Sequence, residues 1–190
     1  MVDTIYAEDE IIGTKKAQEI ISKFRHAKVI SIKRFGEVFN PSNQNFRIQK
    51  INPALILARK QKGFVLNAPE GFGIRDQDNY YFSHMYNCLY DCSYCFLQGM
   101  YDSGNLVVFV NEQDMMDAID ARVSDPKDSS KPTVVSISYN TDLLAMENIL
   151  PLSRRWIDYV RGKKDTIIEI RTKSALFNAG NLFELSEIKL

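Results

Sequence analysis

The chain has 190 residues, 45% of them hydrophobic, which is enough for one substantial core or two small ones. Its 24 basic and 24 acidic residues cancel, so the total charge neither requires nor excludes a polyanionic partner. No apolar run approaches the roughly 18 residues of a membrane span, and we expect no transmembrane segment.

The first residues carry neither a basic leader nor an apolar core, so the sequence predicts no secretory signal and a cytoplasmic protein. Residues 14–26 place their apolar side chains on one stripe, which predicts an amphipathic helix starting near Thr14. Residues 28–33 alternate apolar and polar side chains and predict a short strand.

The next stretch predicts a loop followed by a strand pair. Residues 36–53 are rich in turn-forming residues and favour a loop. Residues 54–58 and 64–66 are apolar runs that we expect to pair with each other across residues 60–63.

A run of basic side chains overlaps this stretch. Residues 47–62 contain no acid and five basic residues, which are Arg47, Lys50, Arg59, Lys60 and Lys62. This pattern is typical of a solvated face, but it also fits a patch that contacts phosphates. The sequence leaves both interpretations open.

A proline and two glycines in residues 68–73 indicate a boundary. We therefore predict an N-terminal α/β region over residues 1–73 and a second region over residues 74–190. In the second region the predicted strands are 80–86, 106–110, 133–138 and 166–171, and the predicted helices are 111–123, 150–161 and 174–185. Strands that alternate with helices imply right-handed crossovers and a parallel sheet.

Three polar segments follow predicted strands in this second region. They are the cysteine-containing loop after Tyr86, residues 139–142 and residues 172–174. Because ligands collect at the carboxyl ends of parallel strands, we expect these segments to converge at one edge of the sheet.

All three cysteines of the chain lie in the first of these segments. Cys88, Cys92 and Cys95 form a Cys-x3-Cys-x2-Cys pattern. Three thiolates on a short loop can bind three irons of a cubane cluster, because soft sulfur ligands select iron–sulfur sites. The fourth iron is then left open to chelate a small molecule through an amine and a carboxylate.

Two other uses of these cysteines are weaker. A structural zinc site is open to the chain because His84, four residues before Cys88, would complete a Cys3His set, although zinc ligands usually come as two separated pairs. A disulfide framework fits poorly, since the cysteine count is odd and the chain is long enough to form a core.

The cysteine spacing, with the aromatic Tyr94 just before the last cysteine, resembles the signature of the radical S-adenosylmethionine (SAM) superfamily. The residues after it resemble one family within that superfamily, spore photoproduct lyase, whose members reverse a thymine cross-link in DNA. The resemblance rests on four segments in order: Cys-Ser-Tyr-Cys-Phe-Leu-Gln, Leu-Val-Val-Phe-Val-Asn, Tyr-Asn-Thr-Asp and Ile-Glu-Ile-Arg-Thr-Lys.

The resemblance implies an α/β fold with a partial parallel (β/α) barrel of the radical SAM type, incomplete at the C-terminus and preceded by a small α/β region. It implies that Cys88, Cys92 and Cys95 ligate a [4Fe-4S] cluster. The residues that it places at SAM are Tyr94, by the adenine, Thr141, at the position of a family serine, and Lys173, at the position of a family lysine.

The chain departs from the family pattern at two positions and in length. Tyr139 stands where the family has a cysteine that returns hydrogen to the substrate, which makes Tyr139 the candidate for that step. Phe96 stands where the family has a tyrosine. The resemblance covers the amino-terminal half to two-thirds of a family member, so we expect a fragment, a truncated reading frame or a chain that completes its barrel with another chain.

The resemblance implies an enzyme that generates a 5′-deoxyadenosyl radical from SAM, with DNA as a possible substrate and a flavodoxin or ferredoxin as reductant. The alternative function is a truncated, catalytically silent module that binds an iron–sulfur cluster or zinc.

Overall fold

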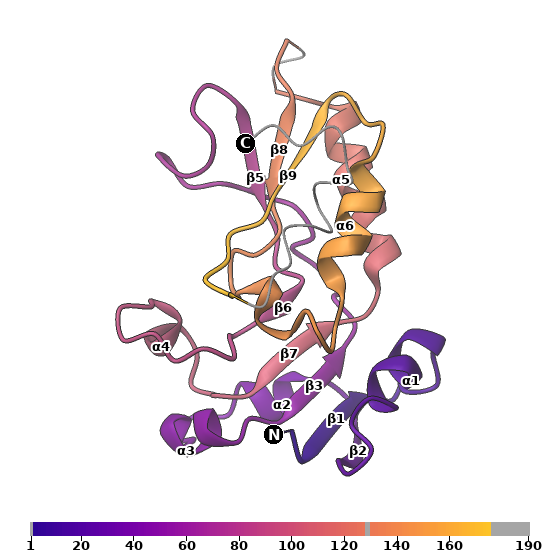
Figure 1. Ribbon diagram of the computed structural model, residues 1–190, viewed down its shortest axis with the longest axis vertical. Coiled ribbons are helices and arrows are strands. Elements are labelled where there is room, and N and C mark those ends of the chain that lie inside the picture. The colour runs from indigo at the N-terminus through magenta and orange to yellow at the C-terminus, as the bar shows by residue number, and fades with distance from the viewer. Residues whose placement is uncertain (1, 128–129, 176–190) are drawn as a thin grey trace.

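Two mainly parallel sheets form the framework of the computed structural model, which describes residues 2–127 and 130–175. The first sheet has the order β2-β1-β3-β7-β6 and the second has the order β4-β5-β8-β9 (Figure 1). The strands of the first sheet are β1 (Thr4–Glu8), β2 (Lys28–Ile32), β3 (Leu55–Ala58), β6 (Met85–Tyr86) and β7 (Leu106–Phe109). Those of the second are β4 (Leu66–Asn67), β5 (Asp78–Tyr81), β8 (Thr133–Ser136) and β9 (Thr166–Glu169).

The first sheet is built around strands that are buried on both faces. Every residue of β3 and β7 is buried, and the two strands run parallel with Leu55 opposite Leu106. Such continuous apolar strands are typical of parallel sheets that are covered on both sides. The predicted pairing of residues 54–58 with 64–66 is therefore wrong, because β3 pairs with β1 and β7 instead. Strand β1 was not predicted from the sequence.

The second sheet contains the predicted parallel arrangement. Strands β5, β8 and β9 run parallel, and α5 (Glu112–Ser124) and α6 (Leu152–Val160) lie side by side along one flank of them (Figure 1). Trp156 of α6 is fully buried. The α/β class with parallel strands is thus confirmed, but the predicted strand 80–86 is divided between β5 and β6, and β7 joins the other sheet.

The helices follow local signals in the sequence. Helix α1 (Lys15–Ile21) begins after Thr14, whose hydroxyl accepts a hydrogen bond from the Ala17 amide at 3.3 Å. Met115 and Ile119 of α5 are buried, as its apolar stripe predicts. A 3-10 helix, η1 (Leu143–Met146), precedes α6.

Of two further predictions, the loop over residues 36–53 needs correction and the helix over residues 174–185 falls largely outside the described residues. Residues 36–53 are not a plain loop, because they form α2 (Gly36–Phe39) and α3 (Phe46–Ile51). Asn45 caps α3 by accepting a hydrogen bond from the Ile48 amide at 3.1 Å. Asparagine favours both turns and helix N-termini, and the sequence prediction took it as a turn residue.

The predicted boundary at residue 73 does not separate the two sheets. Strands β6 and β7 follow that boundary in the chain, yet they belong to the sheet of β1, β2 and β3. The division into residues 1–73 and 74–190 therefore does not coincide with the two sheets. Among the described residues, no helix has the length and apolar character of a membrane span.

Candidate functional site

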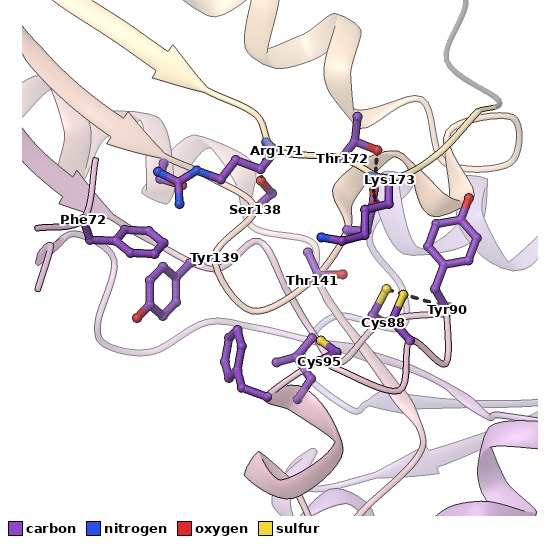
Figure 2. Close-up of a pocket in the computed structure, with 15 residues that line it drawn as sticks. Phe72, Cys88, Tyr90, Cys95, Ser138, Tyr139, Thr141, Arg171, Thr172 and Lys173 are labelled. Carbon is purple, nitrogen blue, oxygen red and sulfur yellow. Dashed lines mark hydrogen bonds between the residues drawn. The ribbon is translucent and has the colours of Figure 1, made fainter. Parts of the chain in front are cut away.

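A cavity of about 310 Å³ lies where three loops meet, beyond the ends of β6, β8 and β9. Its wall includes the three cysteines, residues 138, 139, 141 and 142 after β8, and residues 171–173 after β9. Figure 2 shows these side chains gathered around one space. The three polar segments meet, as predicted, but not at one edge of a single sheet, because the cysteine loop follows β6 of the first sheet and the other two follow β8 and β9 of the second.

The loop that carries the cysteines starts at a sharp bend. Asn87 adopts a positive φ of 67°, a region that asparagine tolerates better than most residues. Its buried side-chain amide donates to the carbonyl oxygens of Ser103 at 2.6 Å and Asn105 at 3.1 Å. These bonds anchor the chain immediately before Cys88 and direct the following residues toward the cavity.

The three cysteines are free and lie at different depths. Cys88 is buried, and this burial raises the pKa of its thiol. The backbone amide of Tyr90 donates to the Cys88 sulfur at 3.4 Å, which favours the thiolate and opposes the effect of burial (Figure 2). Cys92 and Cys95 are half-buried, and the Cys95 amide donates to the Cys92 carbonyl at 3.0 Å.

His84 does not join the cysteines. It is buried beside α6, where its Nδ1 accepts a hydrogen bond from the Trp156 indole at 3.0 Å, and it is not part of the cavity wall. Burial lowers the pKa of His84 to about 3, so the ring is neutral. The alternative Cys3His zinc set is therefore not favoured, because tertiary packing gives this histidine another partner.

Within residues 2–127 and 130–175, no three His, Cys, Asp or Glu side chains lie close enough together to hold a single metal ion. A cubane cluster differs from a single ion in this respect, because each thiolate binds a different iron. Three free thiols on one wall of a cavity are the donor set that such a cluster needs.

Thr141 offers an unused polar atom at the same cavity. Its side chain is buried, and its hydroxyl finds no hydrogen-bond partner among the described residues. Buried hydroxyls are normally paired, so one without a partner on a cavity wall suits a site that receives a polar ligand. Thr141, a predicted SAM-contacting residue, thus belongs to the lining of the cavity.

Lys173 and Tyr94 lie together at the edge of the cavity. The Lys173 ammonium is 5.6 Å from the centre of the Tyr94 ring, a cation–π distance. Lys173 belongs to the cavity wall, whereas Tyr94 does not and is 74% exposed. The two predicted SAM contacts are therefore neighbours, and of the two only Lys173 lines the cavity.

Tyr139 forms an aromatic wall on the opposite side. Its ring stacks on Tyr81 at a centroid distance of 4.1 Å. It also meets Phe72 edge-on at 5.0 Å, and Figure 2 shows these two side chains next to each other. Phe96 lies 6.2 Å away, and the Arg171 guanidinium stands 4.1 Å from the Phe72 ring centre. The candidate hydrogen donor is thus half-buried at the cavity within a group of rings.

No protein-family model and no curated protein matches the chain. Solved structures do. Spore photoproduct lyase complexed with dinucleoside spore photoproduct is 15% identical and has a TM-score of 0.77, over 97% of this chain and 53% of that chain. A mutant with bound AdoMet and the same dinucleoside gives the same values, and another mutant is 16% identical with a TM-score of 0.76.

The chain has the fold of spore photoproduct lyase. The predicted resemblance is confirmed at the level of the fold. The chain spans about half the length of the spore photoproduct lyase structures that it matches, since it covers 53% of them.

Within this spore photoproduct lyase fold, Asp142 has a role that the sequence analysis missed. Its carboxylate accepts hydrogen bonds from the Thr172 hydroxyl at 2.7 Å, the Lys173 amide at 2.6 Å and the Leu144 amide at 3.1 Å. One side chain thereby joins the loop after β8 to the segment after β9. From the sequence, a carboxylate just before a helical turn could have indicated a cap for that turn. The bonds to Thr172 and Lys173 could not be predicted, because these residues are about 30 positions away.

The basic run of residues 47–62 is mostly committed to partners within the fold. Arg47 pairs with Asp91 at 3.2 Å, Arg59 pairs with Asp114 at 2.6 Å, and Lys50 donates to backbone carbonyls of the cysteine loop. Lys60 is buried and cannot reach a phosphate. The solvated-face interpretation holds for Arg47, Arg59 and Lys62, which are exposed, but not for the buried Lys60.

Proposed function

We propose that the chain is the cofactor-binding part of a radical SAM enzyme related to spore photoproduct lyase. Cys88, Cys92 and Cys95 would hold a [4Fe-4S] cluster, and SAM would occupy the adjacent cavity. When bound, these groups supply a 5′-deoxyadenosyl radical that abstracts a hydrogen atom from the substrate.

One observation carries this proposal. The three thiols, the unpartnered Thr141 hydroxyl and Lys173 come from three separate loops, yet all line one cavity. The thiols fit the cluster, and the hydroxyl and ammonium fit a zwitterionic ligand next to it. The solved structure with bound AdoMet has the same fold, which supports a SAM site in this chain.

The residues around the cavity have separable tasks in the proposed enzyme. The Lys173 ammonium pairs with the SAM carboxylate, and the Thr141 hydroxyl supplies one hydrogen bond to the ligand. The exposed Tyr94 ring covers the adenine from the rim of the cavity. Asp142 holds the two loops that carry Thr141 and Lys173 at a fixed separation.

The aromatic side of the cavity is the proposed substrate side. Spore photoproduct lyase structures of this fold contain dinucleoside spore photoproduct, which supports cross-linked DNA as the substrate class. In this proposal the O–H bond of Tyr139 breaks and its hydrogen atom passes to the substrate radical, which leaves the unpaired electron on Tyr139, the residue that takes the place of the family cysteine. A low-potential flavodoxin or ferredoxin supplies the electron, and free thiols suit the reducing cytoplasm.

Anaerobic reconstitution with iron and sulfide tests the proposal. We expect a brown chain whose reduced form shows a [4Fe-4S] EPR signal and which cleaves SAM to 5′-deoxyadenosine under dithionite. A Cys92→Ala variant, which removes a half-buried thiol rather than the buried Cys88, should lose both properties. A colourless chain that binds one zinc ion would instead support the silent module.

The substrate is tested separately with DNA that contains the thymine cross-link. Recovery of thymine alongside SAM cleavage supports repair. Competent SAM cleavage without thymine recovery contradicts the repair assignment and leaves the radical chemistry intact.

A further inference from the structure

Lys50 connects the N-terminal region to the cysteine loop. It lies on α3, and its ammonium donates hydrogen bonds to the carbonyl oxygens of Cys88 and of Tyr90, the latter at 2.9 Å. The two acceptors flank Leu89, so a single side chain fixes the first turn of the loop. An ammonium has three donors and can satisfy both carbonyls at once.

Helix α3, which carries Lys50, is held in place by contacts with Gly104. The Gln49 side chain accepts a hydrogen bond from the Gly104 amide at 2.8 Å, and a Cβ at Gly104 would stand only 2.7 Å from the Phe46 carbonyl oxygen. Such a close approach of two backbones requires glycine. Helix α3 is therefore packed directly against the segment that leads out of the cysteine loop.

A second contact from α3 reaches the far end of the same loop. Arg47 donates to the Gln98 side chain at 3.0 Å, and Gln98 donates in turn to the Cys92 carbonyl at 2.6 Å. The loop is thus held from one helix at both its first and its second cysteine. Lys50 makes the inner contact and is half-buried, whereas the Arg47 side chain is largely exposed.

The charge of Lys50 is not neutralised locally. No carboxylate pairs with it within the part of the chain that the structure describes. Because its ammonium bonds to the carbonyl oxygens of Cys88 and Tyr90, Lys50 places a positive charge beside the first cysteine.

We propose that Lys50 is a positioning residue that holds the cysteine loop in shape and raises the reduction potential of the cluster that this loop binds. The proposal rests on the proposed function, because it requires the cluster. Reduction adds one electron from a low-potential donor and makes the cluster more negative. A nearby positive charge stabilises that reduced form, since charge and hydrogen bonding around a cluster set its potential.

The charge effect is tested by EPR-monitored redox titration of the full chain after anaerobic reconstitution. Lys50→Met removes the charge and both hydrogen bonds while keeping the side-chain length. At a fixed potential we expect its ratio of reduced to oxidised cluster to fall roughly tenfold, which is about 59 mV for one electron. Lys50→Arg keeps the charge and should stay near wild type. Lys62→Met, an exposed residue of the same basic run, is the matched control.

An unchanged potential in Lys50→Met, or an equal shift in Lys62→Met, overturns the charge effect. If Lys50→Met does not fold, as judged by far-UV circular dichroism, Lys50→Gln takes its place with the same expectation. Lys50→Arg remains informative in either case, because a large shift in a variant that keeps the charge contradicts the proposal.

The positioning effect is tested without a cluster, by amide hydrogen exchange of residues 88–98 in the metal-free chain. Exchange should be faster in Lys50→Met and unchanged in Lys62→Met. Equal exchange in Lys50→Met and wild type overturns the positioning role. A wild-type chain that assembles no cluster contradicts the proposed function and the potential effect together, while this exchange measurement still decides the positioning role.

Discussion

The ammonium of Lys60 is buried between aromatic rings. It is 3% exposed, and its Nζ lies 4.6 Å from the ring centre of Phe109 and 5.0 Å from that of Tyr86. Burial lowers the pKa of Lys60 from 10.5 to about 8. Because burial disfavours the charged form, protonated Lys60 costs the folded chain stability at neutral pH.

We predict that Lys60→Met stabilises the chain at pH 7 by about 1–2 kcal/mol, which is the burial cost less the lost cation–π attraction. Between pH 8 and 10.5 the unfolded wild-type chain binds a proton that the folded chain does not, so wild-type stability rises with pH there. The advantage of Lys60→Met should therefore shrink toward pH 10. Urea denaturation of both proteins at pH 7 and pH 9.5 measures this, and a constant advantage would contradict it.

Thr141 makes the second prediction at the scale of a single residue. Thr141→Val keeps the shape of the side chain and removes the unpartnered hydroxyl. We expect SAM affinity of the reconstituted chain to fall about five- to tenfold, the effect of one lost hydrogen bond. Thr141→Ser, which keeps the hydroxyl, should bind normally in the same equilibrium measurement. Equal SAM affinity of the valine variant and wild type would remove Thr141 from the site.

At the scale of elements, the cavity depends on how the loops after β8 and β9 are tied together. Asp142 bonds to Thr172 and Lys173, and the Arg171 amide donates to the Ser138 hydroxyl at 2.9 Å. The Tyr90 hydroxyl donates to Ser174 at 3.0 Å and adds a tie from the cysteine loop. Each loop of the site is thus held by side chains of another loop.

Asp142→Ala should loosen these loops, because the Thr172 hydroxyl and the Lys173 amide lose their acceptor. We expect a loss of about 1–3 kcal/mol in unfolding free energy and faster hydrogen exchange in residues 139–142 and 172–174. SAM affinity should fall at least about tenfold, since both proposed ligand contacts move. A variant with wild-type exchange in these two segments would show that Asp142 does not tie them.

At the scale of the whole molecule, Glu112 joins helices from three parts of the chain. This buried carboxylate begins α5 and pairs with Lys16 of α1 at 2.9 Å and Arg155 of α6 at 2.5 Å. Strands β6 and β7 also carry the chain from the region of the second sheet into the first. Both features indicate that the two sheets unfold together.

We predict that Glu112→Gln lowers the free energy of unfolding by about 1–3 kcal/mol, because two cations lose a buried partner. The expected loss of stability is not larger, because Lys16 and Arg155 are partly exposed and solvent weakens their attraction to Glu112. Asp158→Asn is the control, since its pairing with Arg154 is exposed and should change stability by less than about 0.5 kcal/mol.

Circular dichroism and the fluorescence of Trp156, the sole tryptophan, should give one coincident urea transition for Glu112→Gln and wild type. Two separate transitions would instead support independent units.

The sequence alone determined the features that depend on neighbouring residues. The cysteine spacing identified the site, and apolar periodicity located α1, α5, α6 and most strands, because these signals lie within a few turns of chain. Chain order also predicted that the loops after β8 and β9 meet, since these parallel strands align their carboxyl ends. The cysteine loop reaches the same cavity from β6, which is an antiparallel strand of the other sheet.

Only the tertiary structure decided which strands pair and which side chains serve the site. β7 joins the sheet of β1 and β3, Lys50 reaches a carbonyl 38 residues away, and His84 pairs with a tryptophan 72 residues away. Such partners are selected by burial and by unsatisfied polar groups in the folded chain. A local sequence pattern cannot predict these partners, because which groups pair depends on distances that exist only after the sheets have packed.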